Sequence, residues 1–257
     1  MSYMHFDGSN DELWDEHKWE AHLNEVEKKS DQLRKFISSD PKGTTPRWIT
    51  LLKESLSEDD AFEAYVEEEL LLDEAYFPED EDWDDEDDFE DEDDFLFGYD
   101  DELSDLDEID DFDEGEEWKS LSEDFAVSDY GSLENLLIYN VAKELAVDVL
   151  KWAESVPSTS QTKIFQEYVG DALKIGAKLA GGYSFGFEAD YIGANIAYTK
   201  KALKSANLCL SLLPSMKGQA FVSKREYQNF HSRFYELRND IGVYVQELRD
   251  RFNNRID

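Results

Sequence analysis

The chain has 257 residues, of which 40% are apolar and 34% are charged, and its formal net charge at pH 7 is −38. This length and apolar content suit one or two globular domains. So strong a negative charge argues against binding of the whole chain to free nucleic acid or to an anionic membrane, because both repel it.

The negative charge is confined to one half of the chain. Residues 131–257 carry 16 Lys and Arg against 14 Asp and Glu, a net charge of +2, which leaves 9 against 49, a net charge of −40, in residues 1–130. The partners that such a half attracts are basic proteins, or the basic face of the chain's own second half.

Several features of the sequence favour a cytoplasmic protein without a membrane partner. Cys209 is the one cysteine, so no internal disulfide can form and a reducing compartment is indicated. Because Cys209 lies in the apolar stretch "LCLSLL", we expect a buried structural thiol. The amino terminus lacks the features of a secretory signal, and no run approaches the roughly 18 apolar residues of a membrane span.

Two helical segments are predicted in residues 1–76. In residues 10–38 apolar side chains recur at spacings of three and four, and "SSDPKGTTP" then breaks the helix. Pro46 suits the first turn of a second segment, which reaches about Leu70 and is interrupted around "SEDD". We expect an acidic helical hairpin that packs on another part of the chain, because two helices alone bury little surface.

Residues 77–130 are predicted to be an acidic linker of low complexity, called the acidic arm below. From Glu79 to Trp118 the sequence has 26 Asp and Glu, no Lys or Arg, and seven aromatic rings. Mutual repulsion of the acids favours an extended, disordered chain. The aromatic residues chosen as candidate binding residues are Trp83, Phe89, Phe95, Phe97, Tyr99 and Phe112.

The mixture of acids and rings in the acidic arm admits two interpretations. Acids interleaved with rings imitate the regular charge and flat stacking groups of a single nucleic-acid strand. We therefore hypothesise that the arm masks a basic surface, either on its own bundle or on a partner such as a polymerase, nuclease or reverse transcriptase. The alternative is a solubilising linker whose rings are incidental. A strongly basic external partner balances the charge better, because −40 far exceeds the +2 of residues 131–257.

Four amphipathic helices are predicted in residues 131–257. The cleanest stripe belongs to the third, where side chains repeat at spacings of four and three: Ile192, Ile196, Thr199, Leu203, Ala206, Leu210 and Leu213. Ser223 and Glu226 have the spacing of a capping box at the start of the fourth. Together these segments predict an all-α fold that ends in an antiparallel up-and-down four-helix bundle.

Four stretches of this second half carry a family resemblance: "AKELAVDVLKWAESVP", "GAKLAGGYSFG", "IGANIAYTKKALKSANLCLSLL" and "VSKREY". Over roughly residues 138–252 the chain resembles the four-helix-bundle proteins encoded in intervening sequences of bacterial large-subunit ribosomal RNA genes. The related accessory protein of diversity-generating retroelements has the same fold. The resemblance implies a non-enzymatic bundle, often a ring-shaped homo-oligomer, that binds RNA or DNA and, in the retroelement member, a reverse transcriptase.

The chain departs from this family pattern at the end of the second helix of the bundle. There the family commonly has a run like Asn-Ile-Ala-Glu-Gly-Tyr, followed by small and basic residues. Lys178, Gly181 and Phe185 stand where Asn, Glu and Arg would be expected. These departures affect the implied binding surface more than the implied fold.

Lysines on the second and third helices of the bundle, and one in the turn that follows, form the candidate surface for nucleic acid or a partner. A cationic patch of this kind neutralises phosphates, and salt weakens each contact. A solvated, lysine-rich face is the alternative interpretation. The six residues are Lys174, Lys178, Lys200, Lys201, Lys204 and Lys217.

A rival interpretation is enzymatic. Arg225 and His231 fit the Arg-x(4 to 6)-His pattern of HEPN ribonucleases, helical-bundle proteins in which a dimer brings two such pairs together for metal-free RNA cleavage. This spacing also arises by chance, and a plain surface or boundary histidine is the alternative. We predict no cofactor and no metal site, since the acidic arm lacks the residue pattern of a calcium-binding loop.

The leading expectation is a non-enzymatic accessory or adaptor protein. Its helical bundle would bind nucleic acid or a nucleic-acid enzyme, and its acidic arm would mask a basic surface or mimic nucleic acid. The alternative is a HEPN-like ribonuclease, or an inactive relative, that uses Arg225 and His231. A further alternative is an acidic inhibitor that mimics DNA.

Overall fold

The computed structural model describes residues 14–37, 45–74, 127–128 and 131–254. This part of the chain is almost entirely helical, so the predicted all-α class is confirmed. The helices are α1 (Glu16–Ile37), α2 (Arg47–Glu54), α3 (Glu58–Glu74), α5 (Leu137–Ser155), α6 (Lys163–Ser184), α7 (Ile192–Leu212) and α8 (Lys224–Asn254). Three short 3₁₀ turns, η1 (Leu133–Asn135), η2 (Ser158–Ser160) and η3 (Leu213–Met216), adjoin them.

A very short antiparallel ladder precedes α5. Its strands are β1 (Val127–Ser128) and β2 (Gly131–Ser132), and Val127 lies opposite Ser132. The ladder falls at the end of the segment predicted as the acidic arm. The six candidate aromatic residues of that arm lie outside the described residues.

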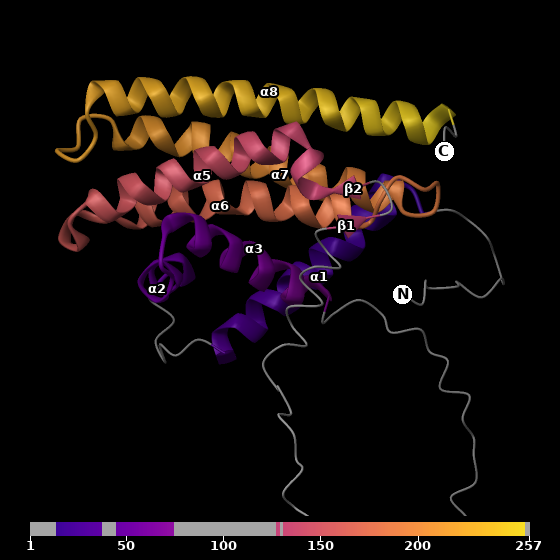
Figure 1. Cartoon of the computed structure of the whole chain (residues 1–257), viewed down its shortest axis with the longest axis horizontal. Coiled ribbons are helices and arrows are strands. Elements are labelled where there is room, and N and C mark those ends of the chain that lie inside the picture. Colours follow the sequence, from indigo (N-terminus) through magenta and orange to yellow (C-terminus); the bar gives the residue numbers. More distant parts are fainter. Residues whose placement is uncertain (1–13, 38–44, 75–126, 129–130, 255–257) are drawn as a thin grey trace, which may run out of the picture.

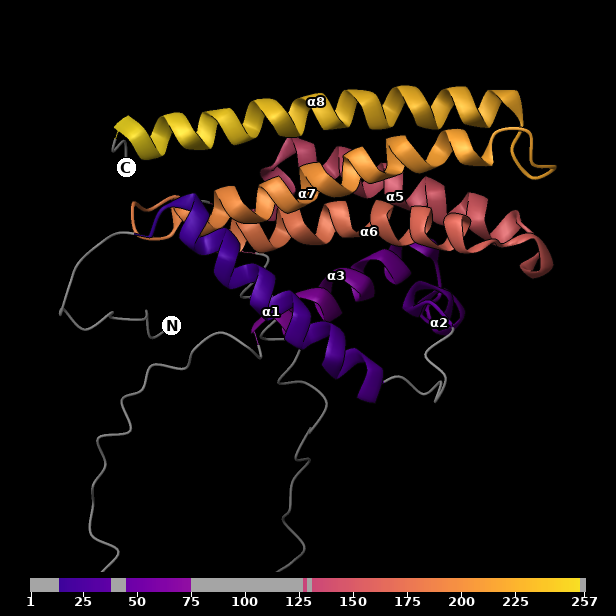
Figure 2. The same cartoon turned by 180° about the vertical axis from the view of Figure 1, so that it is seen from behind.

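Helices α5–α8 lie along one another, and consecutive helices run in opposite directions (Figures 1 and 2). α6 packs against α5 and α7, and α8 packs against α7 and α5, so the four helices surround a common core. Aromatic rings fill part of this core. The ring centroid of Trp152 lies 5.1 Å from that of Phe165 and 5.3 Å from that of Phe230. The indole Nε1 of Trp152 donates a hydrogen bond of 3.2 Å to the carbonyl oxygen of Phe221.

Helices α2 and α3 share this core. The side chains of Trp48, Phe62 and Tyr65 are buried in the same hydrophobic cluster as α5–α8, and α3 packs on both α6 and α5. The closest approach is at Gly176 of α6, where an added Cβ would lie 2.4 Å from Cζ of Phe62. Glycine at this position lets a buried ring rest directly on the helix backbone.

Helix α1 docks through a cluster of its own. It crosses the bundle obliquely, with its first turns beside the beginning of α7 (Figure 2). Trp19 and Leu23 pack there against Ala194, Ala197 and Tyr198. Further along, the Ser30 hydroxyl donates a 3.0 Å hydrogen bond to the Leu72 carbonyl and links α1 to α3. The N-terminal helices therefore form a second layer on the bundle.

Local capping explains where the N-terminal helices begin. The Asp15 carboxylate accepts hydrogen bonds from the backbone amides of His17 and Lys18, which fixes the start of α1 six residues after the predicted start. The second predicted segment is two helices, because the Ser57 hydroxyl accepts from the amide of Asp60 and starts α3 anew.

Two local predictions in the second half are confirmed. The Ser223 backbone amide donates a hydrogen bond of 2.7 Å to the Glu226 carboxylate, and the Glu226 amide donates one of 3.1 Å to the Ser223 hydroxyl. These two bonds form the predicted capping box. The thiol of Cys209 is fully buried, and burial raises its pKa well above the usual range. That thiol is therefore held in the unreactive, protonated form.

The contact between Phe62 and Gly176 yields a stability prediction. Gly176→Ala should destabilise the protein by about 1–3 kcal/mol, because the new methyl group overlaps a ring that has no room to move. The matched control is Gly170→Ala on the same helix, where an added Cβ meets nothing within 4 Å. It should be neutral or stabilising by about 0.5–1 kcal/mol. Urea unfolding of both variants measures the difference, and equal effects would contradict the packing of α3 described above.

Candidate functional site

Part of the predicted lysine surface is covered by the second layer of helices. Three of the six lysines, Lys178, Lys200 and Lys201, form ion pairs with carboxylates of α1 or α3. Lys200 and Lys201 point from α7 toward α1, and their side chains are only 22% and 12% exposed. The outward patch expected from α7 alone is in this structure an interface between helices.

Glu16, in the first turn of α1, joins α7 to α8. Its carboxylate accepts hydrogen bonds of 2.7 and 2.6 Å from the guanidinium of Arg249, and Nζ of Lys200 lies 3.3 Å away. The bonds from Arg249 lower the pKa of Glu16 to about 2, against an opposing effect of burial and with help from Lys200. Glu20 also accepts from Lys200, at 2.6 Å. The charge of Lys200 is therefore matched within the chain.

A second contact, about two turns beyond Glu20 along α1, holds Lys201. Its ammonium donates a hydrogen bond of 2.7 Å to the carboxylate of Glu27 and one of 3.0 Å to the amide oxygen of Asn24. Burial by itself would raise the pKa of Glu27, but the bond from Lys201 and the nearby charge of Lys178 lower it overall. Acids spaced along one face of α1 thus meet the cations of α7.

Lys178 is a buried member of the interface between α6 and α3. Lys178 is only 4% exposed. Its Nζ lies 3.5 Å from the Glu69 carboxylate and 5.4 Å from the ring centroid of Tyr198. A buried ion pair of this kind is strongly destabilising when one partner is removed. The position supports the fold and is closed to a phosphate.

Of the remaining predicted lysines, Lys174 lies near those three, because its charge acts on the Glu27 carboxylate together with those of Lys201 and Lys178. Lys204 and Lys217 are exposed, and Lys217 lies over the ring of Tyr227, 5.4 Å from its centroid. Lys174 is half-buried and, with Lys204, adds positive charge near Asp171, whose pKa is nevertheless raised, chiefly by burial. These lysines leave a weaker and more scattered cationic surface than the sequence suggested.

The three departures from the family pattern all lie under the N-terminal helices. Lys178 pairs with Glu69 of α3. Gly181 leaves room first for the ring of Tyr198 on α7, which would lie 3.0 Å from an added Cβ, and then for Leu70 of α3, whose Cδ2 would lie 3.3 Å away. The ring of Phe185 packs on Trp19 of α1, with centroids 5.7 Å apart. Each departing residue therefore fits the second layer.

The enzymatic alternative finds little geometric support in one chain. Arg225 and His231 are both exposed on α8, and six helical residues place them about 120° apart around the helix axis. His231 stacks on Tyr227, with ring centroids 5.9 Å apart. The two side chains do not converge on a common point within this chain.

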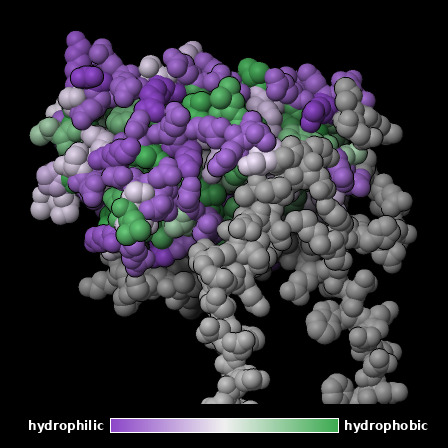
Figure 3. Space-filling view, viewed as in Figure 1, coloured by the Kyte–Doolittle hydropathy of each residue, from purple (hydrophilic) through white to green (hydrophobic). Residues whose placement is uncertain are grey.

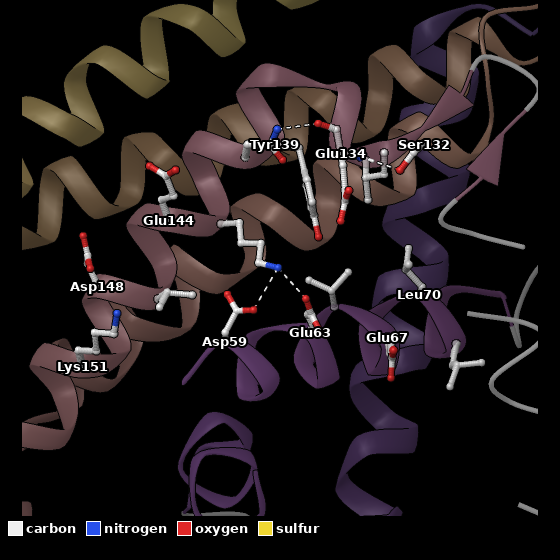
Figure 4. Close-up of a pocket in the computed structure, with 16 residues that line it drawn as sticks. Asp59, Glu63, Glu67, Leu70, Ser132, Glu134, Tyr139, Glu144, Asp148 and Lys151 are labelled. Carbon is white, nitrogen blue, oxygen red and sulfur yellow. Dashed lines mark hydrogen bonds and ion pairs between the residues drawn. The ribbon is translucent and has the colours of Figure 1, made fainter. Parts of the chain in front are cut away.

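A groove between α3 and α5 was not anticipated from the sequence. It has a volume of about 930 Å³, and β2 and η1 lie at one end of it (Figure 4). We call it the α3–α5 groove. Its acidic lining residues are Asp59, Glu63, Glu67, Glu134, Glu144 and Asp148, its basic ones are Lys143 and Lys151, and its larger apolar ones are Val66, Leu70, Leu71, Leu133, Tyr139 and Val147.

The spacing of the acids on α3 was the available signal for this groove. Asp59, Glu63 and Glu67 recur every four residues and so share one face of the helix. Sequence could not reveal what they face, because the contacting residue, Lys143, is 80 positions away from Glu63. The same holds for Glu16 and Arg249, which are 233 positions apart.

The described residues contain no group of three or more His, Cys, Asp and Glu side chains that could hold a metal ion. No helix in the same ranges is both long enough and apolar enough to cross a membrane. Comparisons of the chain with protein-family models, with curated proteins and with solved structures found no match.

The Glu16 contact yields a prediction for the docking of α1. Glu16→Gln should speed amide hydrogen exchange across α1 about 10-fold or more, because charge-assisted hydrogen bonds to Arg249 are each worth about 1.5–3 kcal/mol. Glu25→Gln, an equal change of charge at an exposed site of α1, is the control and should leave exchange unaltered. Similar acceleration in both variants would show that overall charge, and not this contact, holds α1.

The same contact sets the sign of a pH effect. The pKa of Glu16 in the folded chain is about 2, below its ordinary value of 4.5, so the ionised form stabilises the fold. This contribution is complete above about pH 4.5 and is lost as the pH falls toward 2. Hydrogen exchange of α1 should therefore accelerate in that window in the wild-type chain and change less in Glu16→Gln.

Proposed function

We propose that this protein is a non-enzymatic accessory or adaptor protein that binds a basic protein partner, such as a nucleic-acid enzyme, through its acidic surface. The observation that carries the proposal is the pairing of Lys178, Lys200 and Lys201 with acids of α1 and α3. Because the strongest part of the cationic surface is used inside the chain, most of the net charge of −38 is left to act on partners.

Direct binding of free RNA or DNA by the bundle is less well supported. A nucleic acid would have to approach a chain of the same sign of charge and displace Glu16, Glu20 and Glu27 from their lysines. A basic protein is attracted by the negative charge and does not have to displace these glutamates. If it binds nucleic acid, its binding site is already suited to a polyanion. The acidic arm would then mask or occupy that site, as its sequence suggests.

Further features complete the proposal. The antiparallel up-and-down arrangement of α5–α8 serves as a rigid scaffold, the protein is cytoplasmic and forms homo-oligomers, and it is related to the bundles encoded in ribosomal RNA intervening sequences. In favour of the last point, the departures at Lys178, Gly181 and Phe185 coincide with contacts to α1 and α3. A bundle that acquired an acidic second layer would have to change at those positions.

A binding measurement tests the proposed partner chemistry. We expect the full-length chain to bind a fluorescein-labelled amphipathic peptide of about 15 Lys and Leu residues, with an affinity that falls as salt rises from about 50 to 200 mM. A labelled single-stranded RNA of about 20 nucleotides should not bind under the same conditions. Fluorescence anisotropy measures both. RNA binding at an affinity equal to that of the peptide would overturn the preference for a basic partner.

An incubation with the same RNA tests the absence of catalysis. We expect the RNA to remain intact in the presence of the wild-type chain, because Arg225 and His231 do not converge. Gel analysis of the RNA gives the answer. If wild-type protein cleaves it and the double variant Arg225→Ala with His231→Ala does not, the ribonuclease alternative is correct.

A further inference from the structure

The α3–α5 groove combines an apolar floor with acidic walls. Val66, Tyr139 and Val147 are buried along it, and Leu71 at its edge is 43% exposed. Six acids and two lysines line the same space, so its charge is strongly negative. The surface seen in Figure 3 is mainly hydrophilic, with smaller hydrophobic areas between the charged ones. An apolar stripe flanked by acids is complementary to an amphipathic helix whose polar side chains are basic.

Lys143 shows which chemical group the acidic wall accepts. Its ammonium extends from α5 across to α3, where it lies 2.6 Å from the Glu63 carboxylate and 3.3 Å from that of Asp59. Figure 4 labels both acids. Burial would lower the pKa of Lys143, but the hydrogen bonds that its ammonium donates to Glu63 and Asp59 raise this pKa overall. Two carboxylates of α3 thus hold one ammonium from within the chain.

The acidic row continues beyond the reach of Lys143. Glu67 lies one turn further along α3, and burial, with the nearby charge of Glu63, raises its pKa. Within the described ranges neither Glu67 nor Glu144 on the opposite wall has an ion-pair partner, and Asp148 is paired with Arg233 at 2.6 Å. An incoming cation beside Glu67 would relieve the repulsion between Glu63 and Glu67.

The length of the groove fits a short helix. From Asp59 to Leu71 on α3 there are twelve helical steps, which correspond to about 18 Å, or roughly three turns of a partner helix lying alongside. The chain that follows α3 begins the acid-rich run at Glu79, eight residues after Leu71.

We infer that the α3–α5 groove is the docking site for a basic amphipathic helix of the partner protein. This inference rests on the proposed function, since it names the surface on which a basic partner is received. The apolar side chains of the helix cover Leu70, Leu71 and Tyr139. Its Lys or Arg side chains pair with Glu67 and Glu144, as Lys143 does with Glu63 and Asp59.

Charge variants at the groove test the inference on the full-length chain. Glu67→Gln with Glu144→Gln should weaken binding of the labelled Lys and Leu peptide about 5- to 20-fold at low salt, because two ion pairs are lost. The matched control changes the charge equally at exposed sites that do not line the groove, with Glu25→Gln and Glu236→Gln. It should alter the affinity less than about twofold.

Two leucine variants test the contribution of the apolar side chains of the α3–α5 groove. Leu71→Gln should weaken peptide binding about fivefold, while Leu208→Gln on α7, where the leucine is 39% exposed, should not. A peptide of the same composition with Lys and Leu in strict alternation cannot form the apolar helix face and should bind less tightly. Unchanged thermal unfolding of each variant shows that the fold is retained.

The outcomes separate the two proposals. If the wild-type chain fails to bind the peptide, both the proposed function and the groove inference are wrong. If the peptide binds but the groove and control variants weaken it equally, a basic partner is bound by general attraction and only the groove inference fails. If Leu71→Gln abolishes self-association and leaves peptide binding unchanged, the groove is an interface between copies of this chain, which also overturns it.

Discussion

Pairing between the acids of the N-terminal helices and the cations of the bundle determines the surface chemistry of this protein. Glu16, Glu20 and Glu27 of α1 hold Lys200 and Lys201, and Glu69 of α3 holds Lys178 inside the interface. Ion pairs at exposed sites contribute little, but in these pairs the lysine side chains are at most 22% exposed, and packed helices set their geometry. These pairs neutralise three of the cations in a half-chain whose net charge is only +2, and so leave less positive charge on its surface.

The two N-terminal attachments differ in physical character. α3 is held by the common core, where Phe62 rests on Gly176 and leaves no space for another residue type. α1 is held by a small separate cluster around Trp19 together with its ion pairs, so its docking depends more on charge. Regions with fewer buried apolar contacts open more readily, and α1 is therefore the more readily released element of the second layer.

The acids of the N-terminal helices fall into two groups, which differ in how far internal cations neutralise them. The acids of α1 that meet α7, and Glu69 of α3, are paired with internal cations. The row from Asp59 to Glu67 on α3, in contrast, meets a single ammonium, that of Lys143, among the described residues. That imbalance leaves the α3–α5 groove, with its apolar floor, as the place where charge and shape together favour a basic partner.

Features that depend on neighbouring residues could be predicted from the amino-acid sequence. Helical periodicity placed α5–α8, the capping box at Ser223 and Glu226 marked the start of α8, and an apolar context marked Cys209 as buried. Tertiary structure alone decided which charges meet, because Glu16 and Arg249 or Glu63 and Lys143 are far apart in the chain and no spacing rule connects them. Lys200 and Lys201 were predicted to be part of a cationic binding surface, and only the docking of α1 decided that these two side chains are covered.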